Sequence, residues 1–177
     1  MLKYMQEYPD FSFSFSQPQL YEYLKQDYPD LYRQVKKRVR EGRWECLGAS
    51  WIEQDNNIPS GESLIRQILY GNAFFEEEFG IRSRIAWLPD SFGFTWSLPQ
   101  ILRKSEIDYF ATTKMSWNFY HVFPYSLFWW QGIDGTRILF LMSDETYNLQ
   151  LHPQDLIDHW ARFKTKELAP EHLEILT

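Results

Sequence analysis

The sequence is short of the features that mark several classes of protein. Only one of its 177 residues is cysteine, Cys46, which excludes a framework of internal disulfides and favours a reducing compartment. Within the apolar pattern "WECLG", Cys46 is predicted to be a buried core thiol. No apolar run approaches the roughly 20 residues of a membrane-spanning helix. Residues 1–10 also lack the pattern of a signal peptide. We therefore expect a cytoplasmic location and no membrane partner.

Positive charge is also scarce. Lys and Arg number 18 against 24 Asp and Glu, which gives a formal net charge of -6, and the basic residues form no stripe. Because nucleic acids and anionic membranes are bound mainly through clustered cations, neither is expected as a partner. Aromatic residues, in contrast, are abundant at 19%. Such rings build protein cores and also stack on the C–H faces of sugars, so the composition permits a carbohydrate ligand.

Strand-like and helix-like patterns alternate along the chain. Strands are predicted over residues 11–16, 43–48, 85–88, 108–113, 126–132 and 136–142, the last two forming a hairpin. Helices are predicted over 1–8, 18–27, 29–41, 62–79, 97–104 and 153–166. This alternation indicates βαβ units and a mainly parallel sheet. A closed (β/α)8 barrel takes roughly 250 residues, so we predict an α/β fold in the form of a partial, incomplete β/α barrel with flanking helices.

Two serines are placed to begin helices. Ser16 is predicted to cap the helix over 18–27, and Ser60 the helix over 62–79. The apolar face of the second helix is predicted to comprise Leu64, Ile65, Ile68, Leu69 and Phe75.

Polar residues gather where the predicted strands end. Trp51, Glu53 and Asp55 lie in "WIEQDNN" after the second strand, Asp90 in "PDSFG" after the third, and Lys114 in "TTKMSWN" after the fourth. In α/β folds the loops that follow strands share one face, where the working residues usually lie. Considered alone, Asp90 fits either a turn or helix-capping carboxylate or a catalytic or metal-binding one.

Self-contained catalytic motifs are missing from the sequence. The four histidines, at 121, 152, 159 and 172, stand in no H-x-D, H-x-H or H-E-x-x-H arrangement. There is neither a Gly-rich phosphate loop nor a G-x-S-x-G elbow. A zinc site or a serine-hydrolase site made by this sequence alone is therefore not predicted.

The strongest signal is an ordered set of segments. "FSFSQPQLYEYL", "GRWE", "IPSGESLIRQILYG", "FFEEEFGIRSR", "AWLPDSFGFTWSLPQIL", "IDYFATTKMSWN" and "FWWQGIDGTRIL" follow one another over nearly the whole chain. Together they resemble the catalytic domain of family 38 glycoside hydrolases, the zinc-dependent retaining α-mannosidases. The resemblance implies that Asp90 is the catalytic nucleophile and also a zinc ligand. It further implies α-mannosides or mannose-containing oligosaccharides as substrates.

Further roles follow from the resemblance. Lys114 matches a cationic position near the nucleophile, and Tyr147 and Asn148 match a segment that contacts substrate. Trp51 and Asp55 belong to a loop on the same face and are expected to line the pocket.

Other residues of the family site have no match in the sequence. A His-x-Asp motif and a downstream histidine are not found, and the acid/base aspartate would follow Thr177. The sequence is therefore predicted to be one domain, residues 1–177, truncated at both ends. We expect this chain alone to be inactive.

Two alternatives stay open from the sequence. A metal-dependent carbohydrate deacetylase would also use a partial β/α barrel, but it requires a nearby pair of histidine ligands that the sequence does not show. A non-catalytic carbohydrate-binding or interaction remnant would use Trp51, Trp96 and Trp117 as stacking platforms. Whatever the function, a truncated barrel exposes sheet edges and apolar helix faces, which are expected to favour self-association.

Overall fold

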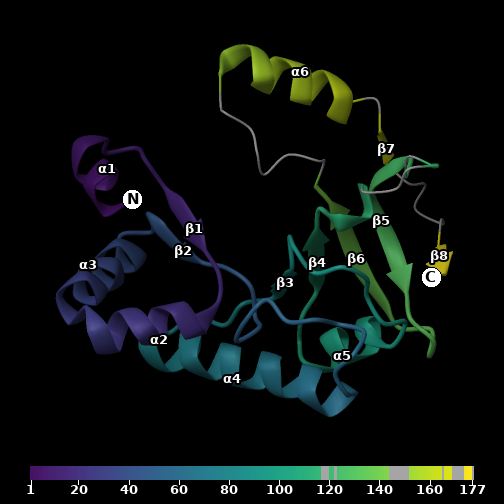
Figure 1. Ribbon diagram of the computed structural model, residues 1–177, viewed down its shortest axis with the longest axis horizontal. Coiled ribbons are helices and arrows are strands. Elements are labelled where there is room, and N and C mark those ends of the chain that lie inside the picture. Colours follow the sequence, from purple (N-terminus) through teal and green to yellow (C-terminus); the bar gives the residue numbers. More distant parts are fainter. Residues whose placement is uncertain (117–119, 122, 144–151, 165, 169–173, 177) are drawn as a thin grey trace.

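The computed structural model describes residues 1–116, 120–121, 123–143, 152–164, 166–168 and 174–176 (Figure 1). The helices are α1 (Leu2–Glu7), α2 (Pro18–Asp27), α3 (Pro29–Arg40), α4 (Gly61–Phe79), α5 (Leu98–Lys104) and α6 (Pro153–Phe163), with a 3-10 turn over Lys114–Ser116. The strands are β1 (Phe13–Phe15), β2 (Trp44–Cys46), β3 (Ile85–Trp87), β4 (Tyr109–Thr112), β5 (Tyr125–Gln131), β6 (Arg137–Met142), β7 (Glu167–Leu168) and β8 (Glu174–Leu176).

The strands form two sheets. Strands β1 and β2 pair in parallel, and a larger sheet has the order β3-β4-β6-β5-β7, with β8 also paired to β5. In the described part of the chain, only the β5–β6 hairpin pairs antiparallel. The predicted α/β class is confirmed. The partial barrel is not, because the strand ladders of the described residues do not join β2 to β3.

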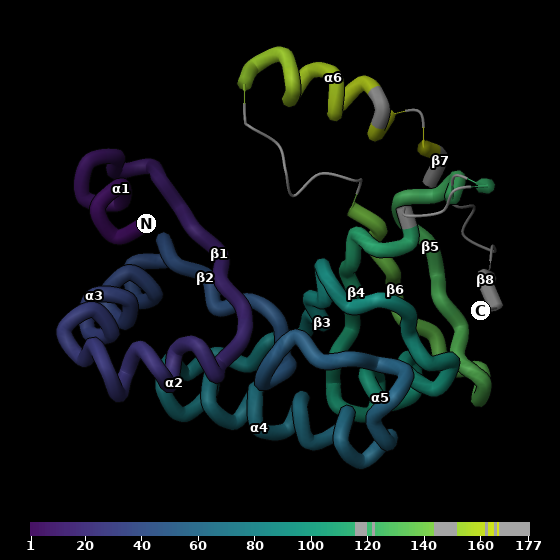
Figure 2. Tube along the Cα trace, viewed as in Figure 1, coloured from purple at the N-terminus to yellow at the C-terminus, as the bar shows by residue number. Residues whose placement is uncertain are grey.

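Two groups of buried side chains fill the interior. The first, here called the aromatic cluster, joins α1, α2, α3 and β2 to the end of α4 and comprises Met5, Tyr21, Tyr32, Val35, Trp44, Cys46, Phe74 and Phe75. The second, the sheet core, lies between the larger sheet, α5 and the start of α4. Helix α4 contributes Leu64 and Ile68 to the sheet core but Phe74 and Phe75 to the aromatic cluster. Figure 2 traces α4 along one side of the molecule, from α5 to α2.

The cap predicted at Ser60 is confirmed, whereas the one at Ser16 is wrong. Ser60 precedes α4, and its hydroxyl accepts a hydrogen bond from the Ser63 amide at 3.3 Å. Helix α2 instead begins after Gln17, whose φ of 67° is left-handed and whose side chain makes no capping bond. Pro18 follows at the first helical position, where a missing N–H leaves no hydrogen bond unmade.

The buried face of α4 is displaced from the predicted one. Ile65 and Leu69 are 42% and 58% exposed, while Gly71 and Asn72 point inward. A Cβ at Gly71 would lie 2.0 Å from the Ala49 carbonyl oxygen, so a glycine is needed where the helix meets this loop. The Asn72 side chain pairs with the backbone of residue 83. The helix therefore turns a small residue and an amide toward the interior, and two aliphatic residues face outward.

Helix α6 stands apart from the larger sheet (Figure 1). It ends at Phe163, earlier than predicted, and exposes Leu156, Ile157 and Trp160. Among the residues that the structure describes, no helix has both the length and the apolar character needed to cross a membrane.

Candidate active site

The strand register brings Asp90 and Lys114 together. Strands β3 and β4 are parallel, with Trp87 opposite Ala111, so positions three residues further along each chain fall level with one another. Those positions are Asp90 and Lys114, and their side chains form an ion pair. The pair lies at the carboxyl ends of the strands, which is the end where α/β folds carry their sites.

Lys114 is buried while Asp90 is open to solvent. The Lys114 side chain is 2% exposed, against 62% for the Asp90 side chain. Its ammonium nitrogen lies 4.6 Å from the centre of the Phe92 ring, which adds a cation–π contact to the ion pair. Because a buried ammonium is costly without a partner, the lysine holds the carboxylate firmly. The exposed part of the Asp90 carboxylate can meet a molecule from solvent.

A second carboxylate, that of Glu53, reaches the same loop. It is half-buried and accepts a hydrogen bond from the backbone N–H of Asp90. Burial raises the pKa of Glu53, and the nearby Asp90 charge adds to this, although the Asp90 amide and Lys114 act in the opposite direction. The sequence placed Glu53 among the polar residues of the loop that follows β2, but no role was predicted for it.

The loops after β2 and β3 are held together by further bonds. The Ser91 hydroxyl donates to the Gln54 carbonyl at 2.7 Å, and the Asn57 side-chain amide donates to the Phe92 carbonyl at 3.2 Å. Gly93 has a φ of +87°, and a Cβ there would lie 2.3 Å from the Asn57 amide nitrogen. The left-handed φ at Gly93 would strain any other residue, and a Cβ there would also displace the Asn57 side chain that joins the two loops.

Asp55 and Trp51 are engaged elsewhere in the structure. The Asp55 carboxylate accepts hydrogen bonds from the backbone of Asn57 and Ile58, at 2.8 Å each, which lowers its pKa. The Trp51 indole N–H donates to Gln19 at 2.8 Å, and the ring packs against the aromatic cluster. The structure thus pairs Asp90 with Lys114, whereas the hydrogen bonds it describes for Asp55 and Trp51 go to other residues. Their substrate-binding roles stay predictions.

Three predicted positions fall outside the described residues. They are Tyr147 and Asn148, expected to contact substrate, and Trp117, expected as a stacking platform. Trp96, the third tryptophan proposed as a platform, is 44% exposed.

The residues that the structure describes do not by themselves fit a zinc ion. They contain no group of three or more His, Cys, Asp or Glu side chains placed to hold a metal. Protein zinc sites supply three or four such ligands. Asp90 could supply one, but its carboxylate is already paired with the Lys114 ammonium. Any zinc bound at Asp90 therefore needs ligands from beyond the described residues.

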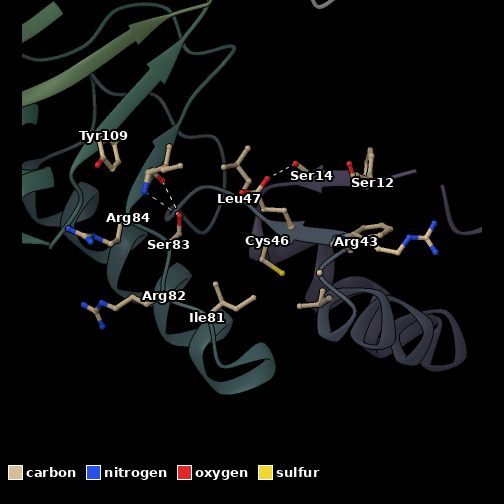
Figure 3. Close-up of a pocket in the computed structure, with 16 residues that line it drawn as sticks. Ser12, Ser14, Arg43, Cys46, Leu47, Ile81, Arg82, Ser83, Arg84 and Tyr109 are labelled. Atoms are coloured by element: carbon tan, nitrogen blue, oxygen red, sulfur yellow. Dashed lines mark hydrogen bonds between the residues drawn. The ribbon is translucent and has the colours of Figure 1, made fainter. Parts of the chain in front are cut away.

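Of the hollows in the described structure, two bear on the location of the site. A cleft of about 620 Å³ separates the two sheets, with Ser14 and Arg43 on one wall and Ser83 and Tyr109 on the other (Figure 3). The first residues of β3 and β4 line this cleft together with the whole of β2, so at the larger sheet it lies at the end opposite Asp90. In α/β folds this amino-terminal end of the strands serves stability, whereas the functional site usually lies at their carboxyl ends.

The second hollow lies on the Asp90 side of the sheet. It has about 190 Å³ and is lined by Gly93, Phe94, Met115, Phe128, Trp130 and Phe140. Gly93 and Met115 stand close in the chain to Asp90 and Lys114, so this apolar hollow is lined in part by the loops that carry the ion pair.

Comparison with known proteins identifies the family. The family described as "Glycosyl hydrolases family 38 N-terminal domain" matches residues 1–176. The chain belongs to this family. It is 45% identical to "Alpha-mannosidase G" of Dictyostelium discoideum over 155 residues, covering 87% of this chain and 14% of that protein. It is 41% identical to the "Alpha-mannosidase" of Saccharomyces cerevisiae over 165 residues, covering 92% of this chain and 15% of that protein.

A solved structure supports the fold assignment. An α-mannosidase from Enterococcus faecalis V583 superimposes with a TM-score of 0.73 at 23% identity, covering 99% of this chain and 21% of that one. This family 38 chain spans about one seventh of the length of the two curated relatives above.

Proposed function

We propose that this family 38 chain is a catalytic segment of an α-mannosidase, with Asp90 as the nucleophile. The observation that carries the proposal is the exposed Asp90 carboxylate at the end of β3, held by Lys114 from behind. The names of the relatives supply the bond that would be cleaved, an α-mannosidic one. The single buried cysteine, Cys46, is compatible with a cytoplasmic setting, which belongs to the same proposal.

The chemistry of such a site is attack by the Asp90 carboxylate on the anomeric carbon. The C–O bond to the leaving group breaks, a glycosyl ester forms, and water later cleaves the ester with retention of configuration. Lys114 holds one oxygen of the carboxylate, and the Asp90 side chain is 62% exposed, so a sugar can approach it from solvent. A retaining enzyme also needs a partner acid about 5 Å away to protonate the leaving oxygen. The described residues supply no assigned partner of this kind, so we propose that it comes from outside them.

The family resemblance adds a zinc ion to the proposal. When bound, zinc would bind sugar hydroxyls beside the nucleophile. Since the described residues do not complete a zinc site, we assign the remaining ligands to other parts of the protein.

We also propose that the two sheets are neighbouring arcs of one β/α barrel. Their parallel strands run in sequence order from β1 to β4, and a Cβ at Gly48, just after β2, would lie 3.4 Å from the Trp87 Cβ on β3. The two sheets therefore converge at their carboxyl ends. An experimental structure of the longer protein with β2 hydrogen-bonded to β3 would support the proposal, and two separate sheets there would contradict it.

The function is tested in a chimera. Residues 1–176 replace the matching segment of the Saccharomyces cerevisiae α-mannosidase, and hydrolysis of an aryl α-mannoside is measured on material that melts cooperatively. We expect hydrolysis, and we expect Asp90→Asn to lower kcat at least ~1,000-fold, as removal of a nucleophile does. The isolated 177-residue chain with added zinc is expected to release no mannose.

The control variant is Glu62→Ala. Glu62 is an exposed acid at the start of α4 whose carboxylate pairs with Arg66. It should leave kcat unchanged. A cooperatively melting chimera that releases no mannose, or full activity in Asp90→Asn, would contradict the proposed function.

A further inference from the structure

Three consecutive residues around the Asp90 carboxylate are anchored from three directions. Before it, the Pro89 carbonyl accepts a hydrogen bond from the Thr113 hydroxyl at 2.5 Å. After it, the Ser91 hydroxyl donates to the loop that follows β2. At the carboxylate's own residue, the backbone N–H donates to Glu53. The main chain is therefore fixed at Asp90 by a side chain 37 positions away in the sequence.

We propose that Glu53 is a positioning residue that sets the main chain of Asp90 for catalysis. The inference rests on the proposed function, because it assumes that Asp90 is the nucleophile. Lys114 fixes the side-chain end of Asp90, and Glu53 fixes its backbone end. With both ends held by different elements, the carboxylate has little freedom to turn away from a bound sugar.

The surroundings of Glu53 fit a positioning role better than the role of a purely structural surface carboxylate. Its carboxylate is half-buried beside the like charge of Asp90, an unfavourable placement that a surface acid would avoid. The hydrogen bond from the Asp90 amide offsets this cost, since bonds to ionised acceptors are about twice as strong as neutral ones. The reach of a glutamate side chain is also needed to cross from one loop to the other.

The consequence for the rate follows from geometry. A misplacement of about 1 Å at a reacting group costs on the order of 100-fold in rate. Glu53→Ala removes the acceptor and is expected to lower kcat of the chimera by about 10- to 100-fold, with KM nearly unchanged. Glu53→Gln keeps an oxygen acceptor at the same length and should restore most of the lost kcat. Glu62→Ala is the matched control and should match the unsubstituted chimera.

A second measurement tests the bond without activity. In the 177-residue chain, hydrogen exchange of the Asp90 backbone amide should be slow. The exchange rate should rise about tenfold or more in Glu53→Ala and should be slow again in Glu53→Gln. Rapid exchange in the unsubstituted chain, or equal exchange in all three, would overturn the proposal.

The two measurements separate the two possible failures. If the chimera is inactive while the exchange pattern holds, the proposed function fails and the anchoring of Asp90 stands. If Glu53→Ala melts at the same temperature with full kcat, or if Glu53→Gln is as slow as Glu53→Ala, the positioning role is wrong.

Discussion

The aromatic cluster and the sheet core bury different kinds of side chain. In the aromatic cluster, buried rings carry polar groups that bond to one another: the Trp44 indole donates to the Tyr21 hydroxyl at 2.9 Å, and that hydroxyl donates to the Phe15 carbonyl at 2.8 Å. The sheet core instead stacks apolar rings on strand ladders, as with Phe128 and Phe140, whose centres lie 4.5 Å apart.

The difference extends to the ionised groups. Around the aromatic cluster, the Glu78 carboxylate accepts hydrogen bonds from Lys25, Tyr32 and Lys36. These bonds join helices α2, α3 and α4. At the edge of the sheet core, Lys114 pairs with an Asp90 that stays open to solvent. Charge therefore joins helices in one region, whereas in the other it pairs a buried lysine with an exposed carboxylate, the proposed nucleophile. Helix α4 is the element that both regions share.

Truncation of one buried ring in each region should have the largest effect. Phe75 and Phe110 are both fully buried, the first in the aromatic cluster and the second in the sheet core. Replacing either by Ala is expected to lower the free energy of unfolding by about 3–5 kcal/mol. Because α4 packs into both regions, urea denaturation should show one transition in each variant. Two separate transitions would show that the regions unfold independently.

The same pair of substitutions separates stability from catalysis. In the chimera at a temperature where both variants are folded, Phe75→Ala should keep kcat, because its ring contacts lie in the aromatic cluster. Phe110→Ala should lower kcat, because Phe110 supports Phe94 in the loop that follows Asp90. Equal loss of kcat in the two variants would contradict the expectation that the sheet core, and not the aromatic cluster, supports the site.

The acid sensitivity of the aromatic cluster comes next in size. Burial alone would raise the pKa of Glu78, but hydrogen bonds from Lys25, Tyr32 and Lys36 outweigh it and lower that pKa from 4.5 to about 2. A carboxyl with a lowered folded-state pKa contributes stability above its unfolded pKa and loses it as the pH falls toward the folded pKa. The loss should amount to roughly 2 kcal/mol between pH 6 and pH 3.

Urea denaturation at pH 6 and pH 3 measures this loss. Glu78→Gln should be less stable at pH 6 and should lack this part of the pH dependence. Replacing the exposed acid Glu62 by Gln should leave the pH dependence as it was. An unchanged pH dependence in Glu78→Gln would show that other groups govern the acid response.

Local patterns in the sequence predicted the positions of most helices and strands. They did not predict features that depend on contacts between residues far apart in the chain. The ends of β3 and β4 could be found from short apolar runs that stop at polar residues, which is why Asp90 and Lys114 could be singled out. The hydrogen bond from Asp90 to Glu53 joins a backbone amide to a side chain in another loop. A backbone donor has no residue type that reveals it, so no pattern in the sequence encodes that contact.

The capping residue before α2 shows the same limit, and the barrel, which stays a proposal, depends on a contact of the same kind. The alternation of strands and helices indicates parallel pairing, but whether β2 meets β3 depends on how the two sheets pack, and the cleft between them keeps their first residues apart. Likewise, Gln17 takes the left-handed conformation before α2, although Ser16 has the better capping chemistry. Each outcome depends on tertiary packing rather than on local preference.

The smallest expected effect concerns the outer face of α4, where the helical pattern misled the prediction. Leu64 and Leu69 have the same side chain on the same helix, but Leu64 is 1% exposed and Leu69 is 58% exposed. Leu69→Lys should change the free energy of unfolding by less than about 0.5 kcal/mol, as surface substitutions do. Leu64→Lys should prevent folding or lower the stability by several kcal/mol, because it places an unpaired charge in the sheet core.

The self-association expected from the sequence stays a prediction, and size-exclusion chromatography tests it on the same proteins. A shift toward monomer in Leu69→Lys at unchanged stability would locate the association on this face, whereas an equal loss of stability in both variants would mean that α4 packs through the face predicted from the sequence after all.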